Sequence, residues 1–116
     1  MKPEAIDEYN EVLRLTPNDL LALYNRGVLY LENGRLPDAS ADMKKIIEHN
    51  PKLAAAHHML GDVYQKEGQI EDAIAEYKRA LEISPELQEA LHSIEEAYRL
   101  KEKIAKNKTA GKAKQE

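Results

Sequence analysis

The apolar residues of this chain recur at helical spacing in six separate stretches. In the stretch at 71–83, for example, Ala73, Tyr77 and Ala80 stand three or four positions apart, which places them on one face of a helix. Charged residues fill many of the positions between them, and proline or glycine marks most stretch ends. The pattern therefore predicts six α-helices, near residues 3–15, 18–33, 37–49, 52–67, 71–83 and 86–104.

A period of 34 residues relates these helices to one another. Side chains of the same kind return after one or two periods: Gly27 as Gly61, Tyr30 as Tyr64 and Tyr98, Gly34 as Gly68, Ala5 as Ala39 and Ala73, and Pro17 as Pro51 and Pro85. So many matches in one phase indicate an internal repeat, in which each unit buries its apolar face by stacking on the next.

The residues at the helix ends fit this repeat. Thr16, Asn50 and Ser84 each stand directly before a proline, so we expect each to be the N-cap of a helix that begins with the proline. Gly34 and Gly68 suit the left-handed C′ position that follows a helix.

Small residues at matching positions predict where two helices approach closely. Gly27 and Gly61 on the first helix of a pair, and Ala39 and Ala73 on the second, leave room for larger side chains beside them. In the last helix Glu95 occupies the glycine position. We therefore expect that helix to be a cap with a polar outer face.

These features together resemble the tetratricopeptide repeat. The resemblance covers residues 3 to about 100 and is densest in His57-x2-Leu60-Gly61-x2-Tyr64, followed by Gly68, Ala73, Tyr77, Ala80 and Pro85. His57 and Arg26 depart from the family pattern. The family has an aromatic residue or leucine at the position of His57, and leucine at the position of Arg26. We expect His57 to pack in the core.

The resemblance implies an all-α fold, a right-handed α-solenoid (superhelix) of antiparallel helix pairs. We expect a single domain at 1–106 and a basic, disordered tail at 107–116. Within the domain we expect a half repeat at 3–17, full repeats at 20–53 and 54–87, and a cap helix at 86–104.

The resemblance also implies a concave groove lined by the first helix of each pair. Carried over position by position, its residues are Leu21, Tyr24, Val28 and Leu31, then Ala55, His58, Asp62 and Gln65, then Glu89, His92, Glu96 and Arg99, with Asn25 beside them. One end of this groove is apolar and the other is charged. Tyr24 is the one tyrosine outside the packing positions of the motif, so we expect it to anchor an apolar side chain of a bound segment.

We therefore interpret the chain as a protein-interaction module that binds a peptide or helical segment of a partner. Some members of the family clamp an acidic C-terminal carboxylate with lysine, arginine and asparagine. Here only Asn25 is a candidate, and Asp62, Glu89 and Glu96 stand where cations would be needed. An acidic groove favours a neutral or basic segment and repels an acidic one.

The alternative function is self-assembly. The N-terminal helix has no preceding helix to cover it, and an open apolar face there would favour a structural scaffold that dimerises or oligomerises through this helix. The competing explanation for the apolar end of the groove is that a missing or symmetry-related helix covers it, in place of a bound segment of a partner.

The histidines raise the question of a metal site. His58 and Asp62 lie four residues apart, and His92 and Glu96 repeat this spacing one period later, as metal ligands or a pH-sensitive patch would. The first helices of neighbouring pairs are about 10 Å apart, however, so the two imidazoles would share one ion only if both side chains leaned together. We interpret both pairs as polar peptide contacts and expect no metal and no cofactor.

Composition and charge exclude other classes of function. Residues 1–99 hold 11 basic and 19 acidic residues, whereas residues 100–116 hold 6 basic and 2 acidic ones. An acidic body repels phosphate backbones, so we expect no nucleic-acid partner. The sequence has no cysteine, no glycine-rich phosphate loop and no catalytic motif, and we expect no enzymatic activity. The sequence contains no run of about 18 apolar residues, so we expect no membrane insertion. The cytoplasm is the default compartment.

Overall fold

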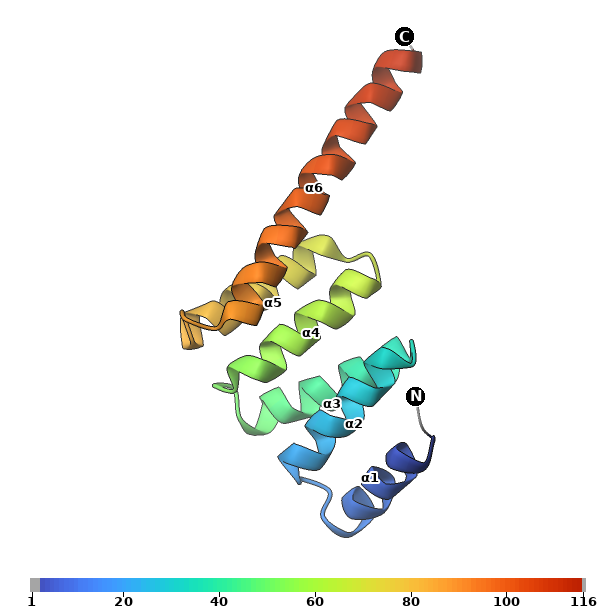
Figure 1. Ribbon diagram of the computed structural model, residues 1–116, viewed down its shortest axis with the longest axis vertical. Helices are drawn as coiled ribbons and strands as arrows, with labels where there is room; N and C mark the ends of the chain where they lie inside the picture. The colour runs from blue at the N-terminus through green and yellow to red at the C-terminus, as the bar shows by residue number, and fades with distance from the viewer. Residues whose placement is uncertain (1–2, 116) are drawn as a thin grey trace.

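The computed structural model describes residues 3–115, with the side chains of residues 5–109. These residues form six α-helices joined by short turns: α1 (Pro3–Leu15), α2 (Leu20–Glu32), α3 (Leu36–His49), α4 (Ala54–Lys66), α5 (Ile70–Ile83) and α6 (Gln88–Gln115) (Figure 1). All six helices predicted from the sequence are present.

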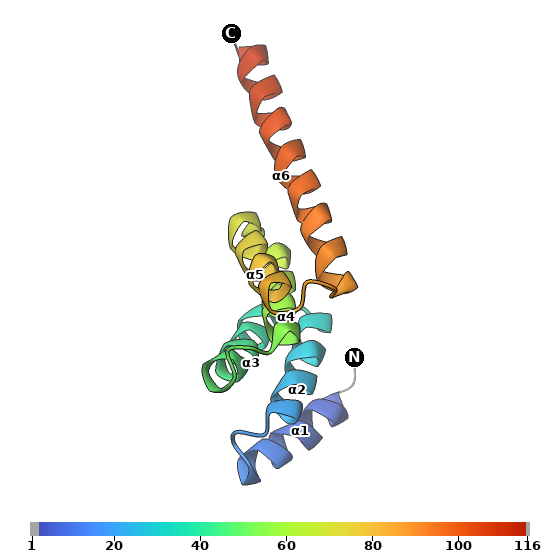
Figure 2. The same cartoon turned by 90° about the vertical axis from the view of Figure 1, so that its left-hand side faces the viewer.

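The helices stack as an elongated array. Each helix packs on its neighbours in the sequence, and α4 also contacts both α2 and α6. Figure 2 shows α3 and α5 on one side of the array and α2 and α6 on the other. The molecule measures 61 × 31 × 20 Å. The fold is therefore the all-α solenoid that the repeat predicted.

Glycine ends two of the helices as expected. Gly34 has a φ of 76° and Gly68 a φ of 81°, a left-handed conformation that side-chain-bearing residues rarely adopt. The Arg35 N–H donates to the Tyr30 carbonyl at 2.8 Å, and the Gly34 N–H donates to the Leu31 carbonyl at 3.1 Å. This pair of bonds is a Schellman motif, and its equivalent follows α4.

The three residues before proline do not cap the helices that follow them, which corrects the expectation from the sequence. Asn50 and Ser84 are the C-caps of α3 and α5, and α2 begins at Leu20 with Asp19 as its N-cap. The Asp19 N–H donates to the Thr16 carbonyl at 3.1 Å, and both later turns repeat this bond. A residue before proline is disfavoured in a helix, so each proline occupies a β-turn between two helices instead.

Close packing at glycine holds the helix pairs together. A Cβ atom placed on Gly61 would lie 2.5 Å from the Tyr77 ring, and one on Gly27 would lie 2.5 Å from the Met43 methyl group. Tyr77 and Met43 are both completely buried. The predicted close approach of α2 to α3 and of α4 to α5 is confirmed.

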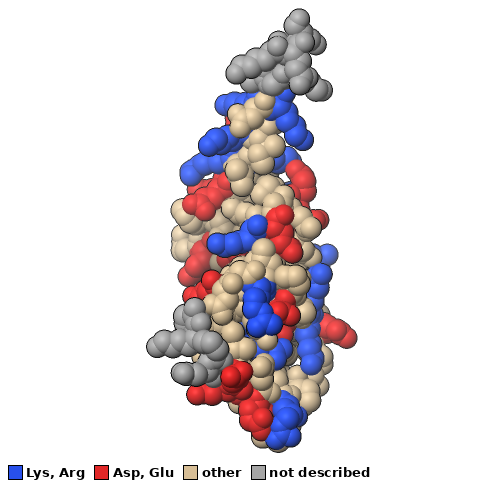
Figure 3. Space-filling view, turned by 90° about the vertical axis from the view of Figure 1, so that its right-hand side faces the viewer, with Lys and Arg blue, Asp and Glu red and all other residues tan. Residues whose placement is uncertain are grey.

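The last helix is longer than the sequence analysis predicted. We expected it to end near residue 104 and residues 107–116 to be disordered, but α6 continues to Gln115; residue 116 lies outside the described residues. The extension at 105–115 is rich in alanine and lysine, which favour helix, and it has no proline. Every described side chain from Lys101 to Thr109 is exposed. Figure 3 shows basic side chains gathered on this stretch.

Candidate functional site

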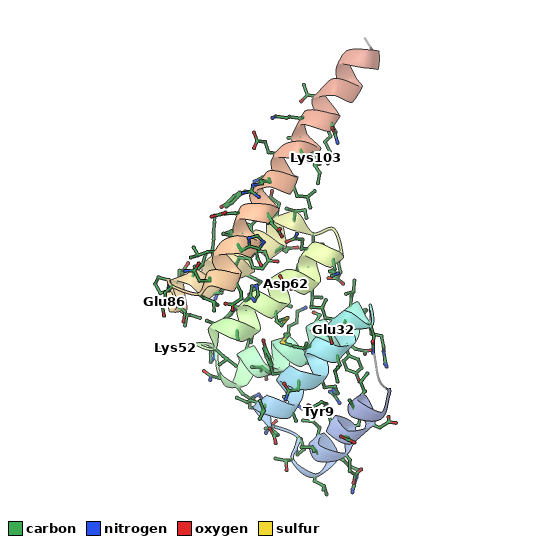
Figure 4. All side chains as sticks on the ribbon, in the orientation of Figure 1. Tyr9, Glu32, Lys52, Asp62, Glu86 and Lys103 are labelled. Carbon is green, nitrogen blue, oxygen red and sulfur yellow. The ribbon has the colours of Figure 1, made fainter. Side chains whose placement is uncertain are left out.

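Helices α2, α4 and α6 together line a depression of about 350 Å³ on one side of the array. Leu31 of α2 and Leu100 of α6 form its apolar margins. Asp62, Gln65 and Lys66 of α4 lie between them, as do Ser93 and Glu96 of α6. Figure 4 labels Asp62 on α4, where α6 passes beside it. Four of the residues predicted for the groove, Leu31, Asp62, Gln65 and Glu96, thus surround one hollow.

A buried tyrosine beneath the depression fixes the central carboxylate. The Tyr77 hydroxyl donates to Asp62 Oδ1 at 2.6 Å, and the Gln65 side-chain amide lies 3.0 Å from the same hydroxyl. Burial and the neighbouring Asp62 carboxylate raise the pKa of Tyr77, so this hydroxyl stays protonated. Asp62 is therefore held in one orientation, with its side chain 29% exposed to the groove.

His58 joins this cluster to the last helix. Its Nε2 lies 3.0 Å from the Ser93 hydroxyl of α6 and 3.7 Å from Asp62 Oδ2. In a catalytic triad the serine and the carboxylate would face different ring nitrogens. Here both face Nε2, so the geometry does not form a relay that could activate Ser93. The contact instead ties α4 to α6 across the floor of the groove.

The apolar end of the predicted groove lies partly within the core. Tyr24 and Val28 are half-buried and pack against the cluster that contains Leu23 and Leu60. Burial, and then the charges of Asp62 and Glu89, raise the pKa of Tyr24. The Tyr24 ring therefore joins the apolar end of the groove to its acidic end.

The remaining predicted residues, Leu21, Asn25, His92 and Arg99, are not among those that line the depression. Leu21 is 70% exposed near the start of α2, and Asn25 is half-buried one turn further on. His92 and Glu96 form an exposed pair on α6 at 3.1 Å, while Arg99 lies 3.8 Å from Glu95. Within the described side chains, no three histidine or acidic residues group closely enough to hold a metal ion.

Two side-chain contacts between helices were not foreseen from the sequence. Arg26 of α2 makes a bidentate contact with the buried Asp42 of α3, with bonds of 2.9 and 2.6 Å, and a third bond of 2.9 Å to Asn10 of α1. His57 of α4 lies 2.8 Å from Glu76 of α5 through Nδ1, and 2.8 Å from a backbone carbonyl through Nε2.

These pairs account for two of the departures from the family pattern, those at Arg26 and His57. Asp42 and Glu76 are one period apart, so each full repeat has one acid at the same place on its second helix. In the first repeat Arg26 contacts that acid, Asp42. In the second repeat His57, which lies one helical turn before the position equivalent to Arg26, contacts Glu76. The recurrence of an acid at this spacing on a mostly buried face was the signal that could have revealed them.

No helix in the described part of the chain has both the length and the apolar character needed to cross a membrane.

The chain belongs to the tetratricopeptide-repeat (TPR) family. The family model described as tetratricopeptide repeat matches residues 20–53 and 54–87, and a second TPR model matches residues 3–34. These matches confirm the two full repeats and extend the family over the N-terminal half repeat.

Among curated proteins, Hsp70-Hsp90 organizing protein 3 of Arabidopsis thaliana is 41% identical over 46 residues. The match covers 40% of this chain and 8% of that protein. The corresponding protein of Triticum aestivum matches to the same extent. The matched segment thus spans less than a tenth of the length of these curated relatives.

Several solved structures share the fold. MamA from Desulfovibrio magneticus RS-1 has a TM-score of 0.78 at 24% identity, covering 84% of this chain and 55% of that one. The first TPR domain of Spaghetti (RPAP3), bound to the HSP90 peptide SRMEEVD, has a TM-score of 0.78 at 22% identity, covering 82% and 75%. A Thermobaculum terrenum O-GlcNAc transferase mutant has a TM-score of 0.77 at 28% identity, covering 79% of this chain but 18% of the transferase.

Proposed function

We propose that this chain is a protein-interaction module whose groove binds a neutral or basic segment of a partner protein. The observation that carries the proposal is the hollow between α2, α4 and α6, in which two carboxylates stand between leucine margins. A lysine or arginine of the bound segment would lay its aliphatic stem on Leu31 and Leu100 and direct its charge to Asp62 and Glu96.

The fixed orientation of Asp62 supports this selectivity. Because the Tyr77 hydroxyl already holds Oδ1, the second oxygen is available to a donor of the ligand with little reorganisation. The related TPR domain of Spaghetti was solved with SRMEEVD, a segment that carries three acidic residues. The carboxylates of this groove would repel such a segment, so we expect a different class of ligand here.

The test compares three peptides of equal length that differ only in carrying lysine, glutamine or glutamate at the central position. Asp62→Asn combined with Glu96→Gln should weaken binding of the lysine peptide by roughly fivefold to tenfold. Glu95→Gln combined with Glu102→Gln is the matched control, because it removes the same charge from exposed positions outside the hollow. Equal losses in both variants, or a preference of the wild type for glutamate, would contradict the proposal.

Tyr24 provides a second test at the apolar end. Tyr24→Ala should lower the affinity for segments with a large apolar side chain, because the ring bridges the core and the groove. Tyr98→Ala is the control, since Tyr98 is a 43% exposed tyrosine of α6 outside the hollow. Unchanged affinity in Tyr24→Ala for every peptide would remove Tyr24 from the site.

A second candidate function is self-assembly through α1. Val12 is 40% exposed, Leu15 68% and Leu21 70%, so half of the large exposed apolar side chains among the described residues lie at this end of the array. Exposed apolar patches of this kind favour association with another protein surface. Light scattering over a range of concentrations tests this candidate, which a strictly monomeric chain would rule out.

A further inference from the structure

A lysine stands among the carboxylates of the hollow between α2, α4 and α6. Among the described residues that line this hollow, Lys66 is the only lysine or arginine. It lies in the last turn of α4, one turn beyond Asp62, and its side chain is exposed. Lys66 was not among the residues that the sequence assigned to the groove. The binding of a basic side chain at Asp62 and Glu96 leaves it without a role.

The ammonium group of Lys66 is not engaged by the protein. A lysine four residues after an aspartate on a helix is well placed to pair with it. Here the Tyr77 hydroxyl donates to Asp62 Oδ1, and the His58 ring lies 3.7 Å from Oδ2. Within the described side chains, no carboxylate forms an ion pair with Lys66. The charge of Lys66 is therefore available to a bound segment.

The end of the helix does not account for this lysine. A cation in the last turn of a helix complements the helix dipole, which is a structural reason for a lysine at this place. The residue of α2 one period earlier is Glu32, and α2 has no basic residue in its last turn. Both helices nevertheless end in the same Schellman motif. The fold thus forms this helix end without a cation, and a contact with a ligand remains as the reason for Lys66.

The spacing of the charges along α4 matches an extended chain. Asp62 and Lys66 are four residues apart, which corresponds to about 6 Å along the helix axis. In an extended segment, residues two positions apart point to the same side and lie about 7 Å from each other. A segment with a basic residue and an acidic residue at this separation can therefore reach Asp62 and Lys66 together.

Electrostatics allow an acid in the hollow only at this place. A carboxylate in contact with Lys66 lies at about half the distance that separates it from Asp62. Because the Coulomb energy varies inversely with distance, the attraction is about twice that repulsion. The basic residue of the same segment, next to Asp62 and Glu96, offsets the repulsion further. A carboxylate elsewhere in the hollow lacks both compensations.

We propose that Lys66 makes the groove selective for an extended segment with a basic and an acidic residue two positions apart. The basic residue contacts Asp62 and Glu96, and the acidic residue contacts Lys66. This inference rests on the proposed function and names the class of segment that the same groove binds. It also makes the spacing of the charges in the ligand, beyond its net charge, a determinant of affinity.

The test uses peptides of one composition, each with a single lysine and a single glutamate. Two peptides carry the glutamate two positions before or after the lysine, one for each chain direction in the groove. Two controls carry it three positions away, where an extended chain turns it to the opposite side. Fluorescence anisotropy at low salt should show that the tighter of the first two binds about twofold to fivefold more tightly than either control, as expected of an exposed ion pair.

Variants of Lys66 assign this preference to its charge. Lys66→Gln should abolish the difference between the two spacings, and Lys66→Glu should reverse it. Lys103→Gln is the matched control, because Lys103 is an exposed lysine of α6 outside the hollow, as its label in Figure 4 shows. It should keep the preference of the wild type. Circular dichroism should show all three variants folded, since both lysines are exposed.

The outcomes separate this inference from the proposed function. A wild type that prefers lysine to glutamate at the central position, yet binds both spacings equally, keeps the proposed function and overturns the role of Lys66. A spacing preference that persists in Lys66→Gln also overturns it. A wild type that binds lysine peptides no better than glutamine peptides contradicts the proposed function, and the inference falls with it.

Discussion

Replacing Gly61 with alanine tests the packing of α4 on α5. The new Cβ atom would lie 2.5 and 2.7 Å from two carbons of the Tyr77 ring. Tyr77 is completely buried and its hydroxyl is anchored to Asp62, so the ring has little freedom to move aside. Gly27→Ala is the matched comparison, because the closest atom there is the terminal methyl of Met43, the end of a flexible side chain.

The expected magnitude follows from two opposing effects. Alanine favours a helix interior over glycine by about 1 kcal/mol, which should stabilise both variants. Overpacking against a fixed ring costs about 1–3 kcal/mol or more and strains the hydrogen bond to Asp62. We therefore expect Gly61→Ala to lose roughly 1–2 kcal/mol of unfolding free energy, and Gly27→Ala to remain within about 1 kcal/mol of the wild type.

Urea unfolding followed by circular dichroism measures both values, and an unchanged m-value would show that the two variants unfold comparably. Adding Tyr77→Met to Gly61→Ala copies the flexible partner of the first repeat and should recover part of the loss. The reasoning is refuted if Gly61→Ala proves as stable as Gly27→Ala, or if Tyr77→Met gives no recovery.

Three further predictions concern other parts of the molecule. Arg26→Ala should lower the unfolding free energy, measured in urea, by about 3 kcal/mol, because it leaves the buried Asp42 carboxylate unpaired. The double variant Arg26→Leu, Asp42→Ala should recover most of this loss, and equal losses in the single and the double variant would contradict the prediction. The pKa of Tyr77 is raised by burial and by Asp62, so the folded state keeps a proton that the unfolded chain releases above about pH 10. Stability should therefore fall more steeply in the wild type than in Tyr77→Phe as the pH rises through about 10, and parallel pH curves would refute this. Deleting residues 107–116 should reduce the helical signal in circular dichroism. It should change the unfolding free energy by less than about 0.5 kcal/mol in dilute solution, because the described side chains of this stretch are exposed. A larger loss would reveal contacts between this stretch and the rest of the helical array.

The features that could be predicted from the sequence are those set by local chemistry. The 34-residue period, the glycines after α2 and α4 and the close approach at Gly27 and Gly61 each follow from what one residue type permits at one position. The starts of α2, α4 and α6 were predicted two residues too early, because proline suits both the first turn of a helix and a β-turn. The choice depends on the path between two packed helices, which local sequence does not determine.

The candidate site was predictable in outline but not in its connections. The resemblance to the family assigned Asp62 and Gln65 to the groove side of α4, and both line the hollow. The hydroxyl of Tyr77 reaches Asp62 from the helix beneath, and Ser93 reaches His58 from the next repeat. Such contacts depend on distances between helices that only the assembled fold sets, so the polar network beneath the groove was missed.

The acid that recurs on the second helix of each repeat has a consequence for how such arrays lengthen. Asp42 and Glu76 occupy the same place, and a partner side chain, arginine in one repeat and histidine in the other, reaches that place from either of two successive turns of the preceding helix. A duplicated or exchanged unit from either repeat would therefore bring its own partner for that acid. Each helix pair contains both members of this contact, which makes the pair, and not the single helix, the interchangeable part.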